Sequence, residues 1–172
     1  MQQLLLLSPT GAEASSLAQR VTHALPIRAV GYRLLPYTLA GQPRGEMLHL
    51  LATPDPVAND VPCTLRLDRT RILDIPDVWT ELAAPALRRC LPRHAPILMD
   101  RLTDAALSSA AFSQAAAACF QGECPVLALA PEQLLPRILP LLGDAAPLIF
   151  HWDATQEQSL SEQLLEELAL RL

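Results

Sequence analysis

The chain has 172 residues and a net charge of −5, and this length is typical of one domain with a full hydrophobic core. Its 18 acidic residues outnumber 13 basic ones, so the composition favours binding neither to nucleic acid nor to an anionic membrane surface. All of the basic side chains are arginine. The absence of lysine excludes a lysine general base, a Schiff-base lysine and the lysine with which a P-loop holds phosphates.

Hydrophobic residues make up 51% of the chain, but they form no run of the roughly 18 residues that a membrane span needs. The apolar run at residues 4–7 is too short for the core of a signal peptide, and no basic residue precedes it, so we expect a soluble, cytoplasmic protein. The cysteines lack close paired spacing, and we expect reduced, mostly buried thiols at Cys63, Cys90, Cys119 and Cys124. The four histidines are scattered, so no metal site is expected.

Short apolar runs alternate with longer helical patterns, which indicates βαβ units, an α/β fold and a mostly parallel sheet. Strands are predicted at residues 4–7, 97–99, 125–130 and 147–151. Helices are predicted at residues 14–24, 77–91 with a kink at Pro85, 103–120, 131–142 with an interruption at Pro136, and 155–172. In the last helix, we expect an inward face of leucines at Leu160, Leu164, Leu165, Leu168 and Leu172.

An antiparallel hairpin interrupts this alternation. Residues 27–36 and 46–53 flank a turn with the sequence Gly41-Gln42-Pro43-Arg44-Gly45, and residues 61–67 extend the pair. We therefore expect a β-hairpin insert over about residues 28–67. No linker or internal repeat divides the chain, which predicts one domain over residues 1–172.

The order of these elements carries a family resemblance. A glycine-containing turn follows the first strand, and the later parts of the pattern are Gly31-Tyr32-Arg33, Pro85-Ala86-Leu87, Ile97-Leu98-Met99-Asp100, Phe112, Pro125-Val126-Leu127-Ala128 and Leu148-Ile149. In this order the chain resembles the small cancer-related nucleoside-triphosphatase family of P-loop proteins, over essentially its whole length and in pattern more than in identity. The resemblance implies a three-layer P-loop domain and, where the motifs are intact, hydrolysis of nucleoside triphosphates with Mg²⁺.

The phosphate-binding motif of that family, G-x-x-x-x-G-K-[ST], is degenerate in this chain. Ser8 stands at the first glycine position, Glu13 at the last and Ala14 at the lysine. Ser15 fits the hydroxyl position, and Gly11 matches a further glycine of the family. A carboxylate at Glu13 would repel each nearby phosphate charge by about 4 kcal/mol at a separation of about 4 Å. Tight binding of a triphosphate in the family's usual pose is therefore not expected.

The second motif is degenerate as well. In the family, an Asp at the end of the buried strand orients Mg²⁺ and the Glu after it is the general base; Asp100 matches the first, but Arg101 replaces the second. A guanidinium cannot accept a proton near neutral pH, so no catalytic residue is predicted. The positions that remain of the nucleotide site, a vestigial site in this hypothesis, are Ser8, Gly11, Glu13, Ala14, Ser15, Ser16, Asp100 and Arg101.

Two arrangements of this site stay open on the sequence. The first strand and the Asp100 strand end at the same sheet edge, so Glu13 and Arg101 either pair across the vestigial site or point separately into solvent. Ser15 and Ser16 are predicted to cap the helix that follows rather than to act as nucleophiles.

Three functions stay open too. The leading hypothesis is a non-hydrolysing interaction, scaffold or accessory protein that binds a protein partner, as a homodimer or heteromer, without a metal or cofactor. The alternative is a divergent Mg²⁺-dependent nucleotide-binding protein or nucleoside-triphosphate hydrolase that uses Ser15 and Asp100. In the third, Arg101 acts in trans on an active neighbouring subunit, as an arginine finger does.

Overall fold

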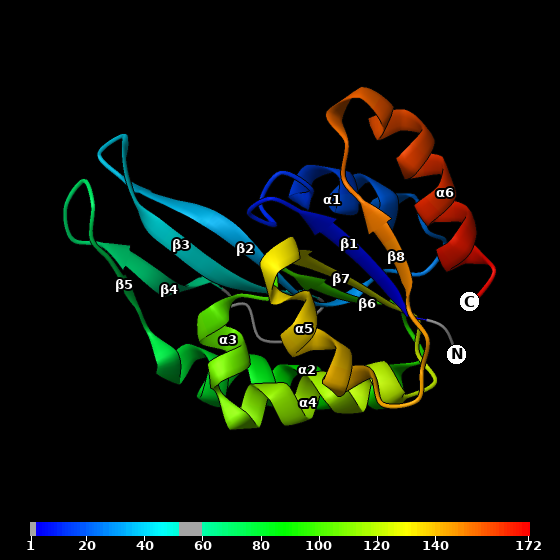
Figure 1. Cartoon of the computed structure of the whole chain (residues 1–172). Helices are drawn as coiled ribbons and strands as arrows, with labels where there is room; N and C mark the ends of the chain where they lie inside the picture. The colour runs from blue at the N-terminus through cyan, green and yellow to red at the C-terminus, as the bar shows by residue number, and fades with distance from the viewer. Residues whose placement is uncertain (1–2, 52–59) are drawn as a thin grey trace.

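The computed structural model describes residues 3–51 and 60–172, and it places one eight-stranded sheet between two layers of helices (Figure 1). The sheet order is β5-β4-β3-β2-β6-β7-β1-β8. The strands are β1 (Leu4–Ser8), β2 (Val30–Leu39), β3 (Gln42–Leu51), β4 (Asp60–Arg66), β5 (Ile72–Asp74), β6 (Ile97–Asp100), β7 (Val126–Pro131) and β8 (Leu148–His151). Strands β2, β6, β7, β1 and β8 are parallel, whereas β3, β4 and β5 add antiparallel pairs. The expected α/β fold with a mostly parallel sheet and an antiparallel insert is confirmed.

The buried strands have the composition that their position requires. Every residue of β1, β6 and β7 is buried, because helices cover both faces of the parallel part of the sheet. Continuous apolar runs such as Leu4–Leu7 therefore form central strands, whereas a strand with one face in water would alternate apolar and polar residues.

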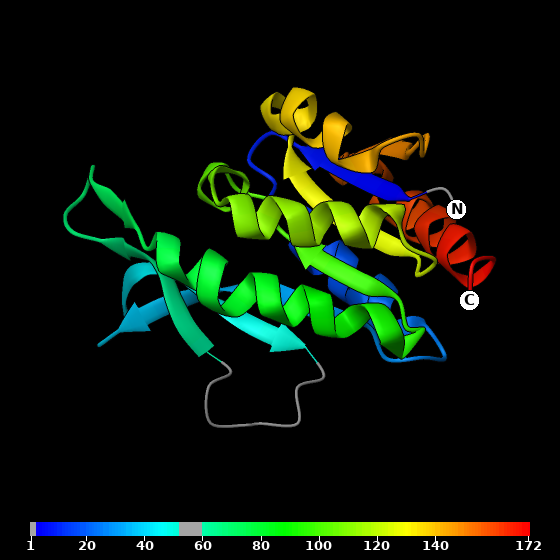
Figure 2. The ribbon, with the colours of Figure 1, turned by 90° about the horizontal axis from the view of Figure 1, so that it is seen from below.

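Helices lie on both faces of the sheet, as the view from below also shows (Figure 2). One face packs on α1 (Ser15–Ala24) and α6 (Glu157–Ala169) through Leu17, Val21 and Leu164. The opposite core contains residues of the remaining helices, which are α2 (Ala84–Cys90), α3 (Asp104–Ser108), α4 (Ala110–Gln121) and α5 (Leu135–Ile138). The three predicted layers are present.

Several helices differ from the sequence prediction. The helix expected at residues 103–120 is two helices, because the Ser109 side chain accepts a hydrogen bond from the Phe112 amide and starts α4. Residues 77–91 contain a π-helical turn (Val78–Ala83) before α2, with Pro85 in the first turn of α2. The segment 131–142 is a series of short helical turns around α5. Leu172 is 43% exposed, so it does not belong to the inward leucine face.

The antiparallel insert is longer than predicted. It continues past residue 67 into β5, all three residues of which are exposed, so no buried alternation marked it as a strand. The last two residues of the predicted strand 46–53 lie outside the described residues. The outer ends of β2 to β5 project beyond the helices as an arm (Figures 1 and 2).

An aromatic cluster fixes the base of this arm. Tyr32, Trp79 and Phe112 are fully buried, and each pair makes an edge-to-face contact with ring centroids 5.3 to 5.9 Å apart. The cluster joins β2 to the π-helical turn and to α4. Trp79 therefore has a packing role.

The four cysteines are free and buried, as expected. Burial raises the pKa of Cys63 and of Cys119 to about 12, which disfavours the reactive thiolate form of these side chains. No helix among the described residues is long and apolar enough to cross a membrane.

Candidate functional site

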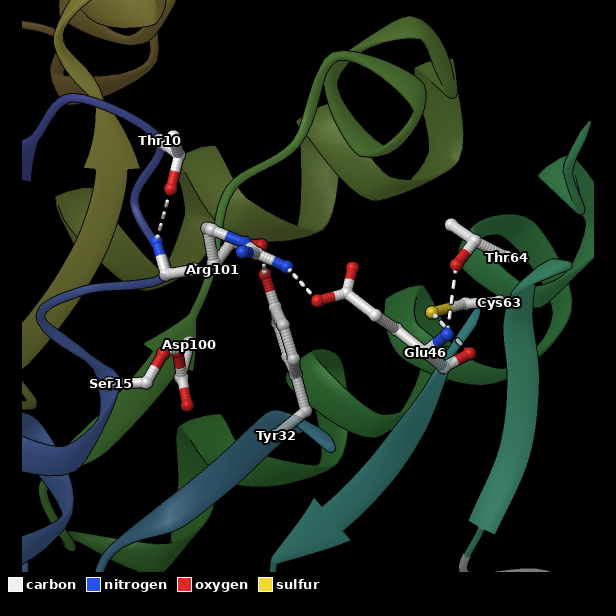
Figure 3. A network of polar contacts seen from close by, with 9 residues as sticks. Thr10, Ser15, Tyr32, Glu46, Cys63, Thr64, Asp100 and Arg101 are labelled. Carbon is white, nitrogen blue, oxygen red and sulfur yellow. Dashed lines mark hydrogen bonds and ion pairs between the residues drawn. The ribbon is translucent and has the colours of Figure 1, made fainter. Parts of the chain in front are cut away.

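The residues of the predicted nucleotide site lie where β1 and β6 end, at the carboxyl edge of the parallel strands. The hydroxyl of Ser15, the first residue of α1, donates a hydrogen bond to Asp100 Oδ1 over 2.5 Å (Figure 3). The predicted convergence of these two residues is thus present. This bond also gives Ser15 a different role from the predicted cap, since no side chain in the described part of the chain caps α1.

Glu13 supplies an anion to the loop that follows β1. Its carboxylate accepts hydrogen bonds from the Ser8 hydroxyl over 2.9 Å and from the Thr10 amide over 3.2 Å. Desolvation opposes ionisation of Glu13, but bonds from its own amide, from Thr10 and from Ser8 outweigh it and hold the pKa of Glu13 below its usual range. Donors in a loop of the kind that would hold a phosphate are therefore already bonded to a carboxylate of the same chain.

The Asp100 carboxylate is fully buried, and an arginine lies near its second oxygen. Asp100 Oδ2 has no hydrogen-bond partner among the described residues and lies 3.8 Å from Arg33 Nε. Burial raises the pKa of Asp100, although the Ser15 hydroxyl and the Arg33 charge partly oppose this rise. The Arg33 guanidinium also donates a hydrogen bond of 2.7 Å to the carboxamide oxygen of Gln19.

These surroundings do not suit a Mg²⁺–nucleotide group. Ser15 and Asp100 offer oxygen atoms of the kind that Mg²⁺ binds, but Arg33 already places positive charge beside Asp100. Ala14, at the lysine position, has a side chain that is 0% exposed and packs in the core. Ser16 is exposed on the first turn of α1.

Arg101 extends toward the arm. Its guanidinium pairs with Glu46 Oε1 on β3 over 2.5 Å, and its backbone oxygen accepts a hydrogen bond of 3.1 Å from Tyr32 (Figure 3). Its aliphatic stem lies against Gly11, where a Cβ would be 2.5 Å from Arg101 Cδ.

Both arrangements predicted for Glu13 and Arg101 are therefore wrong. Arg101 pairs with Glu46 instead of Glu13, because Glu13 already has two donors in its own loop. It does not point into solvent either, since its side chain is 9% exposed. A side chain this buried is not displayed to a neighbouring subunit, so the geometry argues against an arginine finger in trans.

A shallow pocket with a volume of about 490 Å³ opens beside this pair. Its lining includes Arg101 and two acids, Glu46 and Asp104, and the polar side chains of Thr10, Thr103 and Gln133. Two carboxylates against one guanidinium give the pocket no excess of positive charge, so it does not favour a triphosphate.

The sequence reasoning gave no site role to three residues of the site: Tyr32, Arg33 and Glu46. Tyr32 and Arg33 belong to the family pattern Gly31-Tyr32-Arg33, but that pattern carries no role for them, and no motif marks Glu46. A usable signal was the register of β2 against β6, which pairs Arg33 with Asp100 and Tyr32 with Met99.

The hydrogen bonds of Glu13 make a pH-dependent contribution to stability. Because the pKa of Glu13 is lowered by folding, its contribution is present above the unfolded pKa and is lost as the pH falls through the folded pKa. We expect Glu13→Gln to lower the free energy of unfolding by about 0.5 kcal/mol at pH 7 and to have little effect below about pH 3. Urea unfolding of both proteins across this pH range measures the difference in the free energy of unfolding. Glu123→Gln, which removes the same charge at an exposed turn position, is the control, and a loss of equal size in both variants would show that the hydrogen bonds of Glu13 are not the cause.

No protein-family model and no curated protein sequence matches the chain. Among solved structures, it is similar to THEP1 from the hyperthermophile Aquifex aeolicus, with a TM-score of 0.77 and 14% identity over 97% of this chain and 99% of that one. It is also similar to a human cancer-related nucleoside triphosphatase, with a TM-score of 0.71 and 14% identity over 96% of both chains. The chain therefore has the P-loop nucleoside-triphosphatase-like fold that the order of its sequence elements predicts.

Proposed function

We propose that the protein keeps this fold without nucleotide chemistry and acts as an interaction or accessory protein for another protein. The observation that carries this proposal is the Glu13 carboxylate, which is hydrogen-bonded inside the loop after β1. An anion that belongs to the chain stands where the fold would accept the phosphates of a ligand.

Charge supports the same conclusion at two further positions. Ala14 leaves the loop without the lysine that neutralises phosphate, and the Arg33 guanidinium is the cation beside Asp100. The chain thus supplies the negative charge in the loop from Glu13 and the positive charge beside Asp100 from Arg33. A ligand is needed for neither.

The general base is missing as well. The position after Asp100 holds Arg101, whose guanidinium is bound to Glu46 and cannot take a proton from water. Hydrolysis would need another base, and Glu13 is turned into its loop. This supports a function in binding, and the buried free cysteines support a reducing compartment, the cytoplasm.

One observation favours the alternative, a divergent Mg²⁺-dependent nucleotide-binding protein. The Ser15 hydroxyl and Asp100 Oδ1 are 2.5 Å apart, so both oxygens that such a site needs are in one place. The two functions differ in whether ligand binding depends on Asp100.

Thermal denaturation with ATP or GTP and Mg²⁺ separates the two. We expect no shift in Tm with either nucleotide, because the repulsion from Glu13 has no lysine to offset it. A saturable shift that Asp100→Ala abolishes, and that Asp144→Ala, an exposed control outside the site, keeps, would establish the alternative.

The protein partner is sought by affinity purification from the native host, followed by reciprocal purification with the partner tagged.

A further inference from the structure

The charge of the molecule is concentrated at opposite ends. We define the arm tip as residues 39–45 and 65–73, at the outer ends of β2 to β5. Its charged side chains are Arg44, Arg66, Asp68, Arg69 and Arg71, which give it a net charge of +3. Because the whole chain carries −5, the remainder carries −8. A cationic tip thus projects from an anionic body.

The arm tip also exposes large apolar side chains. Leu39, Leu67, Ile72 and Leu73 are between 48% and 59% exposed. In the described part of the chain, β5 has no strand on its outer side. Proteins usually protect an edge strand from such exposure, and apolar residues among arginines are typical of an interaction surface.

A complementary surface lies on α6. Glu162, Glu166 and Leu170 follow one another at intervals of four residues and are exposed, so they share the face that points away from the sheet. We call this the α6 outer face. Residues 144–172 contain six acids and one arginine, which give this segment a net charge of −5 from its side chains. Leu170 is 75% exposed and adds an apolar group to the acidic face.

The arm and α6 lie at opposite ends of the molecule in both views (Figures 1 and 2). An arm tip therefore cannot reach the α6 of its own chain. In an antiparallel pair of molecules, each arm tip faces the α6 of the other. A two-fold axis then satisfies both contacts at once and closes the assembly.

We propose that the arm tip of one copy docks on the α6 outer face of a second copy, and that two such contacts form a two-fold dimer. The occupant is a second copy because the chain itself carries both halves of the complementary pair, basic with apolar and acidic with apolar. This goes beyond the proposed function and does not depend on it.

Sedimentation velocity tests the dimer with charge-reversed variants. Arg66→Glu/Arg69→Glu reverses the tip without touching Arg71, which pairs with Asp68 over 2.6 Å. Glu162→Arg/Glu166→Arg reverses the α6 outer face. We expect either pair of substitutions to weaken dimerisation about a hundredfold, because like charges then meet in both contacts. Raising the salt concentration should weaken the wild-type dimer as well.

Mixing the two variants gives the sharper result. The acidic tip of the first variant meets the basic α6 of the second, and the basic tip of the second meets the acidic α6 of the first. We therefore expect the mixture to dimerise with near wild-type affinity although each variant alone is monomeric. Arg88→Glu/Arg89→Glu makes the same change in net charge as the tip variant, but on α2, and should leave the dimer intact.

Three results would overturn the dimer: a monomeric wild type at low salt, a mixture that stays monomeric, or a control that dissociates as the tip variant does. Circular dichroism confirms that each variant is folded. The nucleotide measurement is independent. A dimer that binds nucleotide would contradict the proposed function alone, and a monomer that binds none would contradict the dimer alone.

Discussion

Gly31→Ala is expected to destabilise the protein by about 4 kcal/mol or more, enough to unfold much of a domain of ordinary stability. Gly31 has a φ of +109°, and a Cβ on it would lie 2.1 Å from the Leu98 carbonyl oxygen of β6. The carbonyl oxygen is a backbone atom in the middle of the sheet, where Gly31 pairs with Leu98. Neither strand can move without breaking the pairing that carries Tyr32 and Arg33 to the site. Urea unfolding monitored by tryptophan fluorescence measures the loss.

Gly41→Ala is the matched control. Gly41 also has a positive φ, +75°, but no atom lies within 4 Å of the position that a Cβ would take. The cost there is backbone strain alone, about 1 kcal/mol. An equal loss at both positions would show that the contact with Leu98 is not the cause.

The sequence predicts the centre of the fold and of the site well, for a physical reason. Runs such as residues 4–7 and 97–99 are apolar because helices cover both faces of their strands. Parallel strands also end at one edge of the sheet, so the meeting of Ser15 with Asp100 follows from order alone. Neither inference needs knowledge of side-chain directions.

The partner of Arg101 could not be predicted in this way. Glu46 lies 55 positions earlier, on an antiparallel strand whose register and bulge decide which side chain faces the site. A register shift of one residue would point Glu46 to the other face. The helix break at Ser109 was hidden for another reason, because the alanine-rich stretch around it has too little contrast in polarity to show an interruption.

Repair of the loop is expected to create nucleotide binding where the wild type has none. The variant Ser8→Gly/Glu13→Gly/Ala14→Lys restores the pattern G-x-x-x-x-G-K-S across residues 8–15. Removing the Glu13 carboxylate and adding a lysine each change the interaction with a phosphate charge by up to about 4 kcal/mol. Each change alone is then worth up to about a thousandfold in affinity. Isothermal titration calorimetry with ATP and Mg²⁺ measures the gain.

The gain should come with a loss of stability in the absence of ligand. Ala14 is 0% exposed in the core that packs under α1, so a longer side chain there costs about 1 to 3 kcal/mol before a phosphate draws it into the loop. Hydrolysis should not return, because Arg101 still stands where a base is needed.

The control puts the new lysine two residues earlier. Ser8→Gly/Glu13→Gly/Ala12→Lys has the same net charge, but Ala12 is exposed at the outside of the loop. Binding by the repaired variant alone would show that the lysine has to stand at position 14, where the motif places it. Equal binding by both variants would mean that the position of the lysine does not matter, and that the net charge or the changes at positions 8 and 13 account for the gain. If neither binds, the cause lies beyond the loop, and the Arg33 guanidinium beside Asp100 is the next group to remove.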